Sequence, residues 1–176
     1  QQYMINGAFD FWQEATSFAA IANGTYFADQ WEYVKVGSMV HTVSRSANFP
    51  GFMSGYSALV DCTTVDAAIA AGDYCAVRQK IEGNVLKTFK GKNLVFAFDV
   101  VSPKAGIHCV SFSNSAGTMS IVKEFTVTSA NVRERIYVRF NHDVTGAWNY
   151  NTSIGMVAYF PLAAGTTFQT TPGTWQ

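Results

Sequence analysis

The chain has 176 residues, of which 48% are hydrophobic and 14% charged, and twelve basic residues balance twelve acidic ones. This composition excludes an intrinsically disordered chain, and zero net charge gives no general attraction to nucleic acid or an anionic membrane. No apolar run approaches the ~20 residues of a membrane-spanning helix, and no signal-peptide pattern opens the chain. We expect one folded domain over residues 1–176, without nucleic acid or a membrane span as partner. Because the chain begins Gln1-Gln2 rather than Met, we expect it to be processed or excised from something longer.

The first thirty residues carry a dense aromatic pattern beside two acids. Asn6-Gly7 predicts a turn, because glycine adopts positive φ readily. Phe9-Asp10-Phe11-Trp12 then places one carboxylate among three aromatic rings, and Ala28-Asp29-Gln30-Trp31 repeats the pairing of an acid with an indole. We expect Trp12 and Trp31 to pack in the core rather than to stack on a ligand.

Strands follow along most of the chain. Trp31–Val36 alternates with period two, which is typical of a strand, and Gly37-Ser38 is expected to turn it back as a hairpin into Met39–Ser46. Turns rich in Gly, Pro and Asn, such as Glu82-Gly83-Asn84, separate the later segments. The further strands are predicted at Tyr56–Cys62, Tyr74–Glu82, Asn93–Val101, Ile107–Ser113, Ser120–Thr128, Val132–Asn141 and Ser153–Phe160.

One segment has a helical pattern. Thr63 stands three residues before Asp66, as in a capping box, and the alanine-rich run after it ends at Gly72, so we expect one short helical turn near 64–71. Eight or nine short strands with turns between them indicate an all-β fold, an antiparallel β-sandwich. Its core is expected to include alternate residues of two strands: Leu94, Phe96, Phe98 and Val100, and Ile136, Val138 and Phe140.

The cysteines Cys62, Cys75 and Cys109 are odd in number and lack metal-ligand spacing. A Cys62–Cys75 disulfide is one alternative. Buried free thiols are the interpretation that their strand-like surroundings favour, and this fits a protein made in a reducing cytoplasm.

The opening residues, Asn6-Gly7-x-Phe9-Asp10-x-Trp12-Gln13 followed by Ala28-Asp29-x-Trp31, carry a family resemblance. They resemble the start of jelly-roll domains, related to galactose-binding-like carbohydrate-binding modules, that recur in tail and other virion proteins of bacteriophages. Later segments follow the same order as in that family: 71–74, 79–83, 91–100, 159–170 and 173–176.

This resemblance implies a jelly roll in a phage tail fibre or similar appendage, made in the host cytoplasm and displayed on the virion surface. In the family a closing strand follows the Trp-Gln that stands here at Trp175-Gln176. We therefore expect that the closing C-terminal strand is missing from this chain or supplied by a neighbour. A homo-oligomer, with a trimer favoured, is the expected assembly.

The residue types needed for catalysis do not form a recognisable motif. His41 and His108 lie in predicted strands, where structural or surface imidazoles are common, and His142-Asp143 is expected to be a solvated turn. Nothing in the sequence pairs two carboxylates across a cleft, as a glycosidase requires. We therefore expect no catalytic residue and no enzymatic activity, with polysaccharide hydrolysis as the enzymatic alternative.

The resemblance also implies a structural calcium ion near the opening motif, held by an acidic side chain and backbone carbonyls. Asp10 matches the acidic position. The family's other acidic ligand comes from the last strand, which this chain lacks, so a turn in which Asp10 accepts backbone hydrogen bonds is the alternative. No other cofactor is expected.

Two stretches have the composition of a sugar-binding surface, with aromatic rings beside amide and guanidinium groups. The first is the loop His142–Asn151, with Trp148, Asn149, Tyr150 and Asn151, which is hard to justify as core. The second is the outward face of strand 132–140, with Arg133, Arg135, Tyr137 and Arg139, which would suit an acidic glycan or a carboxylate-bearing partner surface.

Both stretches would also suit roles that involve no sugar. An arginine stripe is commonly a solvated strand face that discourages pairing with another strand. Trp148 and Tyr150 would equally suit a contact between subunits, where aromatic residues are common.

Two functions follow from these observations. The first is a non-catalytic carbohydrate-binding-like module that attaches a phage to host-surface glycan. The alternative is a structural decoration or assembly domain that binds neighbouring virion proteins, favoured by the low charge and by the apolar loop Phe49–Met53.

Overall fold

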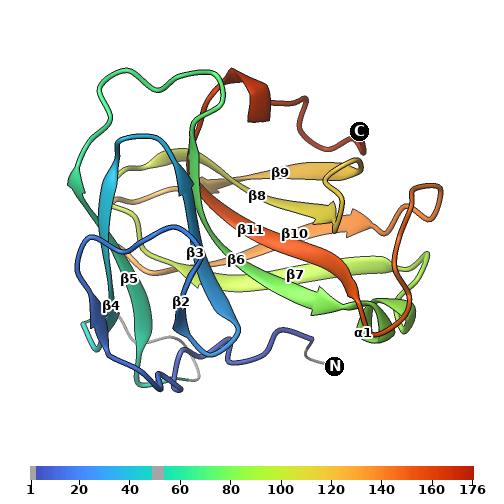
Figure 1. Cartoon of the computed structure of the whole chain (residues 1–176), viewed down its shortest axis with the longest axis horizontal. Helices are drawn as coiled ribbons and strands as arrows, with labels where there is room; N and C mark the ends of the chain where they lie inside the picture. Colours follow the sequence, from blue (N-terminus) through green and yellow to red (C-terminus); the bar gives the residue numbers. More distant parts are fainter. Residues whose placement is uncertain (1–2, 49–53) are drawn as a thin grey trace. The chain divides into compact units, whose positions relative to one another are not determined.

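The computed structural model describes residues 3–48 and 54–176, and there the protein is built almost entirely from antiparallel β-strands (Figure 1). The predicted all-β antiparallel sandwich fold is confirmed. The chain divides into two compact units: unit 1 runs to Gln79 and includes Pro161–Gln169, and unit 2 comprises Lys80–Phe160 and Thr170–Gln176. The apolar loop predicted at Phe49–Met53 lies outside the described residues.

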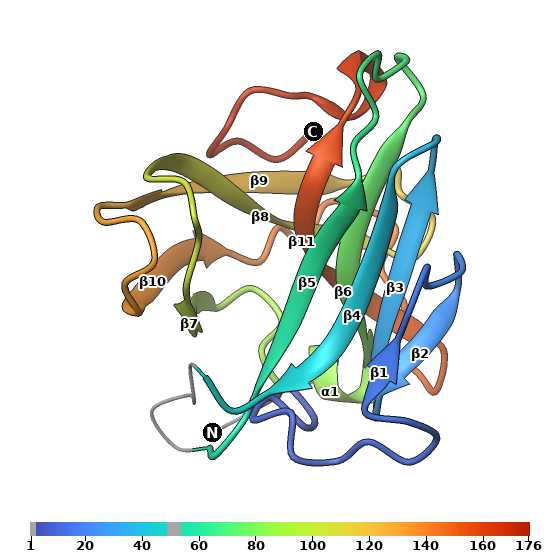
Figure 2. The ribbon, with the colours of Figure 1, turned by 90° about the vertical axis from the view of Figure 1, so that its left-hand side faces the viewer.

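Unit 1 contains two antiparallel arrays of strands among its described residues. Tyr33 in one array and His41 in the other are both buried, and the Tyr33 hydroxyl lies 2.6 Å from His41 Nδ1. The unit is therefore two layers whose facing residues form its core. The arrays are β1 (Ser17–Phe18), β4 (Val40–Ser46) and β5 (Ser57–Thr64), which lie side by side in Figure 2, and β2 (Thr25–Ala28), β3 (Trp31–Val36) and β6 (Tyr74–Glu82).

The strand predicted at Trp31–Val36 is confirmed as β3, but the predicted hairpin between it and the next strand is wrong. β3 pairs with β2 and β6, whereas β4 pairs with β1 and β5. Gly37, at φ 117°, turns the chain from one layer to the other. A glycine turn between two alternating segments is common to hairpins and to such layer crossings, so the pattern does not distinguish them.

The helical turn predicted near 64–71 is also wrong. β5 continues to Thr64, and the Asp66 carboxylate then accepts hydrogen bonds from the backbone N–H groups of Ser38 and Ala68, both at 3.1 Å. An aspartate that bonds nearby backbone groups in this way stabilises a turn in place of a helix. Helical segments occur instead at α1 (Gly83–Lys87), where a plain turn was predicted, and at η1 (Thr166–Phe168).

Unit 2 is a two-stranded ribbon packed on a second layer. Phe140 of the ribbon stacks on Phe112 of that layer with ring centroids 4.2 Å apart, and Phe96 meets Phe112 edge-on at 5.2 Å. Ile136, Val138 and Phe140 are buried, as predicted. The ribbon is β7 (Asn93–Val100) and β10 (Glu134–Asn141), and the second layer is β8 (Gly106–Asn114) between β9 (Ser120–Val127) and the first part of β11 (Ile154–Ala164).

The last residues of the chain lie along β9. Ser120 and Gln176 exchange two backbone hydrogen bonds of 2.8 and 2.9 Å, and the Gly173 N–H donates to the Val122 carbonyl at 2.7 Å. Trp175 Nε1 donates to the Asn141 carbonyl at 2.7 Å. The C-terminal residues therefore pair with a strand of unit 2, while a further closing strand stays a prediction.

All three cysteines are free thiols. Cys75 is buried, as predicted, and Cys109 is half-buried. The prediction of burial is wrong for Cys62, which is exposed.

Candidate functional site

The outward side of the β7–β10 ribbon presents a continuous polar and aromatic surface, here called the ribbon face. Side chains alternate along both strands, so every second residue points away from the aromatic core of unit 2. The predicted outward orientation of Arg135, Tyr137 and Arg139 agrees with their exposure, and Tyr137 is 63% exposed. The ribbon face consists of Asn93, Val95, Ala97 and Asp99 on β7 and Arg135, Tyr137, Arg139 and Asn141 on β10.

The strand register pairs these residues across the ribbon and places an ion pair at the Arg135 end of the ribbon face. Arg135 lies opposite Asp99, and its Nη1 donates to Asp99 Oδ1 at 3.1 Å. This hydrogen bond raises the pKa of Arg135 above its ordinary value, and the guanidinium also lies 5.8 Å from the centre of the Tyr137 ring. The positive charge of Arg135 is therefore matched by a carboxylate.

The other end of the ribbon face has a different character. Arg139 lies opposite Val95, and Asn141 lies opposite Asn93, so the guanidinium is flanked by two amides and an aliphatic side chain. An open hollow of about 460 Å³ occurs there, lined by Asn93, Leu94, Val95, Arg139, Phe140 and Asn141. This end combines a cation, neutral hydrogen-bonding groups and apolar surface within one concavity.

The loop predicted as the other ligand surface is packed into unit 2. Trp148 is only 8% exposed, and its ring lies against His142 at 4.6 Å and Trp175 at 5.5 Å, centroid to centroid. The expectation that this stretch lies outside the core is therefore wrong for Trp148. An indole enclosed by two aromatic neighbours has little free ring face for a sugar to stack on.

The neighbours of Trp148 hold the loop in place. Asn149 Nδ2 donates to Ser115 Oγ and to the Ile154 carbonyl, both at 3.0 Å, and Asn151 Oδ1 accepts from the Ser153 N–H at 2.9 Å. Tyr150 is half-buried beneath the Lys90 ammonium, which lies 4.5 Å from the ring centre. The amide groups predicted to bind a ligand are thus already engaged in the local structure, and a ligand role for these residues stays a prediction.

His142 is a further feature that the sequence did not indicate, because a solvated turn was expected and the imidazole is only 3% exposed. Its Nδ1 accepts the Gly91 N–H at 3.2 Å, which leaves Nε2 as the protonated nitrogen of the neutral ring. Burial lowers the pKa of His142. Within the described residues, His142 Nε2, Trp148 Nε1 and the Tyr150 hydroxyl are buried without a hydrogen-bond partner.

The opening motif forms a hydrogen-bonded turn in unit 1. Asn6, at φ 48°, accepts the Phe11 N–H through its side chain at 3.1 Å and the Trp31 indole N–H through its carbonyl at 3.0 Å. Trp31 is buried, as predicted, while Trp12 is half-buried with its ring centroid 5.4 Å from that of Phe27. This turn ties the N-terminal segment to β3.

Asp10, the predicted calcium ligand, lies in the same turn. Ser54 Oγ lies 2.8 Å from Asp10 Oδ1 and 2.6 Å from the Ala8 carbonyl oxygen, and its single proton can be donated to only one of them at a time. Asp10 therefore meets a side-chain hydroxyl, and the expected acceptance of backbone hydrogen bonds by Asp10 stays a prediction. Among the described residues no group of three His, Cys, Asp or Glu side chains is placed to hold a metal ion. Calcium binding at Asp10 stays a prediction.

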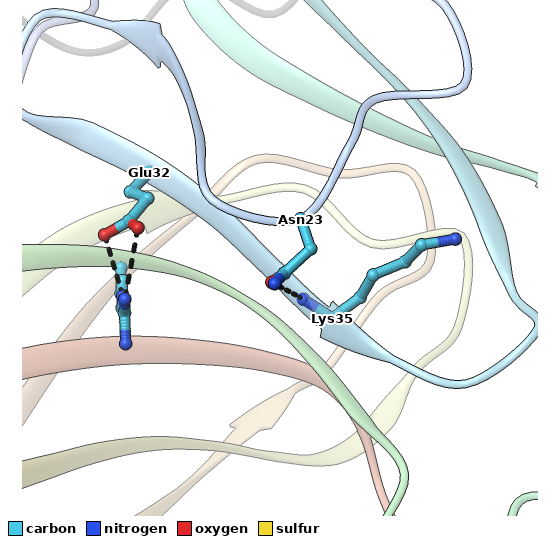
Figure 3. Close-up of polar contacts among 4 residues, drawn as sticks. Asn23, Glu32 and Lys35 are labelled. Atoms are coloured by element: carbon cyan, nitrogen blue, oxygen red, sulfur yellow. Dashed lines mark hydrogen bonds and ion pairs between the residues drawn. The ribbon is translucent and has the colours of Figure 1, made fainter.

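Unit 1 also holds a partly buried ion pair between neighbouring strands. Arg78 on β6 donates two hydrogen bonds to the Glu32 carboxylate on β3, at 2.9 and 3.1 Å, and Asn23 Oδ1 accepts the Lys35 backbone N–H nearby at 2.9 Å (Figure 3). Because both charged groups are directed at each other, this pair stabilises the β3–β6 register.

Comparison with family models, with curated proteins and with solved structures finds no match to this chain. Among residues 3–48 and 54–176, no helix has the length and apolar character to cross a bilayer.

Proposed function

We propose that the protein is a non-catalytic attachment module of a phage tail fibre or similar virion appendage, and that it binds host-surface glycan through the ribbon face. The observation that carries the proposal is the exposed Tyr137 ring between two guanidinium groups on one face of the ribbon. The virion setting is supported by the sequence resemblance.

The chemistry of the ribbon face suits a sugar. Pyranose rings present C–H groups that pack on aromatic faces, and hydroxyl groups that bind amides and guanidinium groups. The residue opposite Tyr137 is Ala97, whose small side chain leaves the phenol ring uncovered from that strand. Asn93 and Asn141 supply amides at the same face.

A glycan array with the full chain tests this proposal, followed by affinity measurements on any polysaccharide that binds. Tyr137→Ala is expected to weaken binding about tenfold, which corresponds to about 1.4 kcal/mol. Tyr26→Ala is the matched control, because Tyr26 is 48% exposed on β2 in unit 1 and should leave the affinity unchanged. Absence of binding to every bacterial surface polysaccharide, or equal losses in both variants, would refute the proposal.

The alternative function is a decoration or assembly domain, and unpaired strand edges favour it. β5 is the outer strand of β1-β4-β5 in the described residues, and its Leu59 is 47% exposed. An open edge can accept a strand from a neighbouring protein. Light scattering on the isolated chain separates the two functions: a trimer would favour assembly, and a clean monomer would weaken that alternative.

A further inference from the structure

We infer that the Arg139 end of the ribbon face is a subsite for the carboxylate of an acidic sugar, so that the glycans bound are uronic-acid polymers. This inference rests on the proposed function and adds the class of ligand and the residue that selects it.

The two arginines of the ribbon face differ in the charge around them. Arg135 is bonded to Asp99 at 3.1 Å, so an incoming anion would compete with an existing carboxylate. Arg139 has Val95 directly opposite, and the diagonal positions on β7 are Asn93 and Ala97. These cross-strand neighbours are all neutral, so the uncompensated positive charge of the ribbon face lies at Arg139.

The spacing of the groups suits one sugar ring. Residues two apart on a strand are about 6.6 Å apart, so Arg139 and Asn141 can contact opposite sides of a single pyranose. The hollow is lined by Arg139 and Asn141 of β10 together with residues of β7, and Val95, which is 57% exposed, adds apolar surface for the sugar C–H groups. The arrangement therefore provides one cation for an acid group and two amides for hydroxyl groups.

A uronate suits the Arg139 end of the ribbon face better than a phosphate-linked polymer. A guanidinium presents parallel N–H donors that fit the two oxygens of a carboxylate, and a single positive charge balances its single negative charge. A phosphodiester in a wall polymer also carries one negative charge, but in a ribitol-phosphate polymer it joins open-chain alditols. Val95, which is exposed directly opposite Arg139, instead suits an acid group carried on a pyranose ring whose C–H groups pack on apolar surface. The structure therefore favours uronate over phosphate-containing wall polymers.

The test uses polygalacturonate, alginate and hyaluronan, each beside its carboxyl-reduced form, with a ribitol-phosphate polymer as a separate arm. We expect at least one uronate polymer to bind and to lose affinity on carboxyl reduction. Arg139→Gln should weaken that binding about tenfold to a hundredfold, since it removes charge-assisted hydrogen bonds. Arg135→Gln should weaken it less, because Asp99 already engages that guanidinium.

Arg45→Gln serves as the matched control, since the Arg45 guanidinium lies over the Tyr56 ring in unit 1, 4.3 Å from its centre. Circular dichroism and thermal melts establish that each variant folds. The inference is overturned if carboxyl-reduced polymers bind equally well, if Arg135→Gln costs as much as Arg139→Gln, or if only the phosphate polymer binds. Binding of neutral glycans alone, dependent on Tyr137, would overturn the inference and leave the proposed function standing. Absence of any glycan binding would overturn both.

Discussion

Replacement of Gly83 by alanine tests how α1 and the loop at 149–151 pack within unit 2. Gly83 is the first residue of α1, and its N–H donates to the Ser153 carbonyl at 2.8 Å. A Cβ atom at this position would lie 2.4 Å from the Asn149 carbonyl oxygen and 2.7 Å from that of Asn151. Both distances are about 1 Å shorter than the ~3.5 Å of an ordinary van der Waals contact.

Two effects of opposite sign act at this position. Alanine is a better helix former than glycine, which would stabilise the protein by up to about 1 kcal/mol. The steric overlap is with backbone atoms, which cannot rotate away as a side chain can, and overpacking of this kind costs about 1–3 kcal/mol. We expect the overlap to dominate, with a net loss of about 1–2 kcal/mol and a fall in Tm of roughly 2–8 °C.

Urea unfolding followed by tryptophan fluorescence measures this change, with thermal melts as a second readout. Gly72→Ala is the control, because a Cβ there meets nothing within 4 Å and Gly72 does not have a positive φ. A Gly83→Ala protein as stable as the wild type, or more stable, would show that Asn149 and Asn151 do not lie against α1 as described.

Two further predictions concern buried titratable groups. Burial lowers the pKa of His41 and of His142, so below about pH 6.5 the unfolded chain binds more protons than the folded protein. The free energy of unfolding should therefore be highest above that pH and fall as the pH drops, by at most about 1.4 kcal/mol per pH unit for each histidine. Urea unfolding midpoints at pH 7.5 and pH 5.5 measure this change, and coinciding midpoints would contradict it. Burial raises the pKa of Cys75 to about 11 and also raises that of Cys109. In the folded protein a thiol reagent at pH 8 should therefore modify the exposed Cys62 quickly, the half-buried Cys109 more slowly, and the buried Cys75 only on unfolding. Three equally fast thiols would contradict this order.

The strands were predictable where alternation is strong and both flanks carry turn residues. The inward Phe and Val residues of β7 and β10 determine which side chains face outward, so the orientation of Tyr137 followed from period two alone. Which strands pair with each other could not be predicted from this alternation. Gly37-Ser38 fits a hairpin and a layer crossing equally well, and the contact between Tyr33 and His41 that accompanies the crossing joins two different layers.

The candidate site was predictable only in part. Arginine and tyrosine on β10 marked the ribbon face, but the difference between Arg135 and Arg139 depends on the register with β7, which places Asp99 opposite one and Val95 opposite the other. Trp148 was misplaced for a related reason. Its burial requires Trp175 from the end of the chain, and sequence patterns do not reveal contacts between such distant segments.

The most direct measurement is an NMR titration of the ¹⁵N-labelled full chain with oligomers of the polysaccharide that binds most tightly. If the ribbon face is the binding surface, the largest shift changes should fall on Asn93, Val95, Tyr137, Arg139 and Asn141, and they should saturate with the measured affinity. Saturable changes confined to residues 142–151 or to unit 1 would contradict binding at the ribbon face.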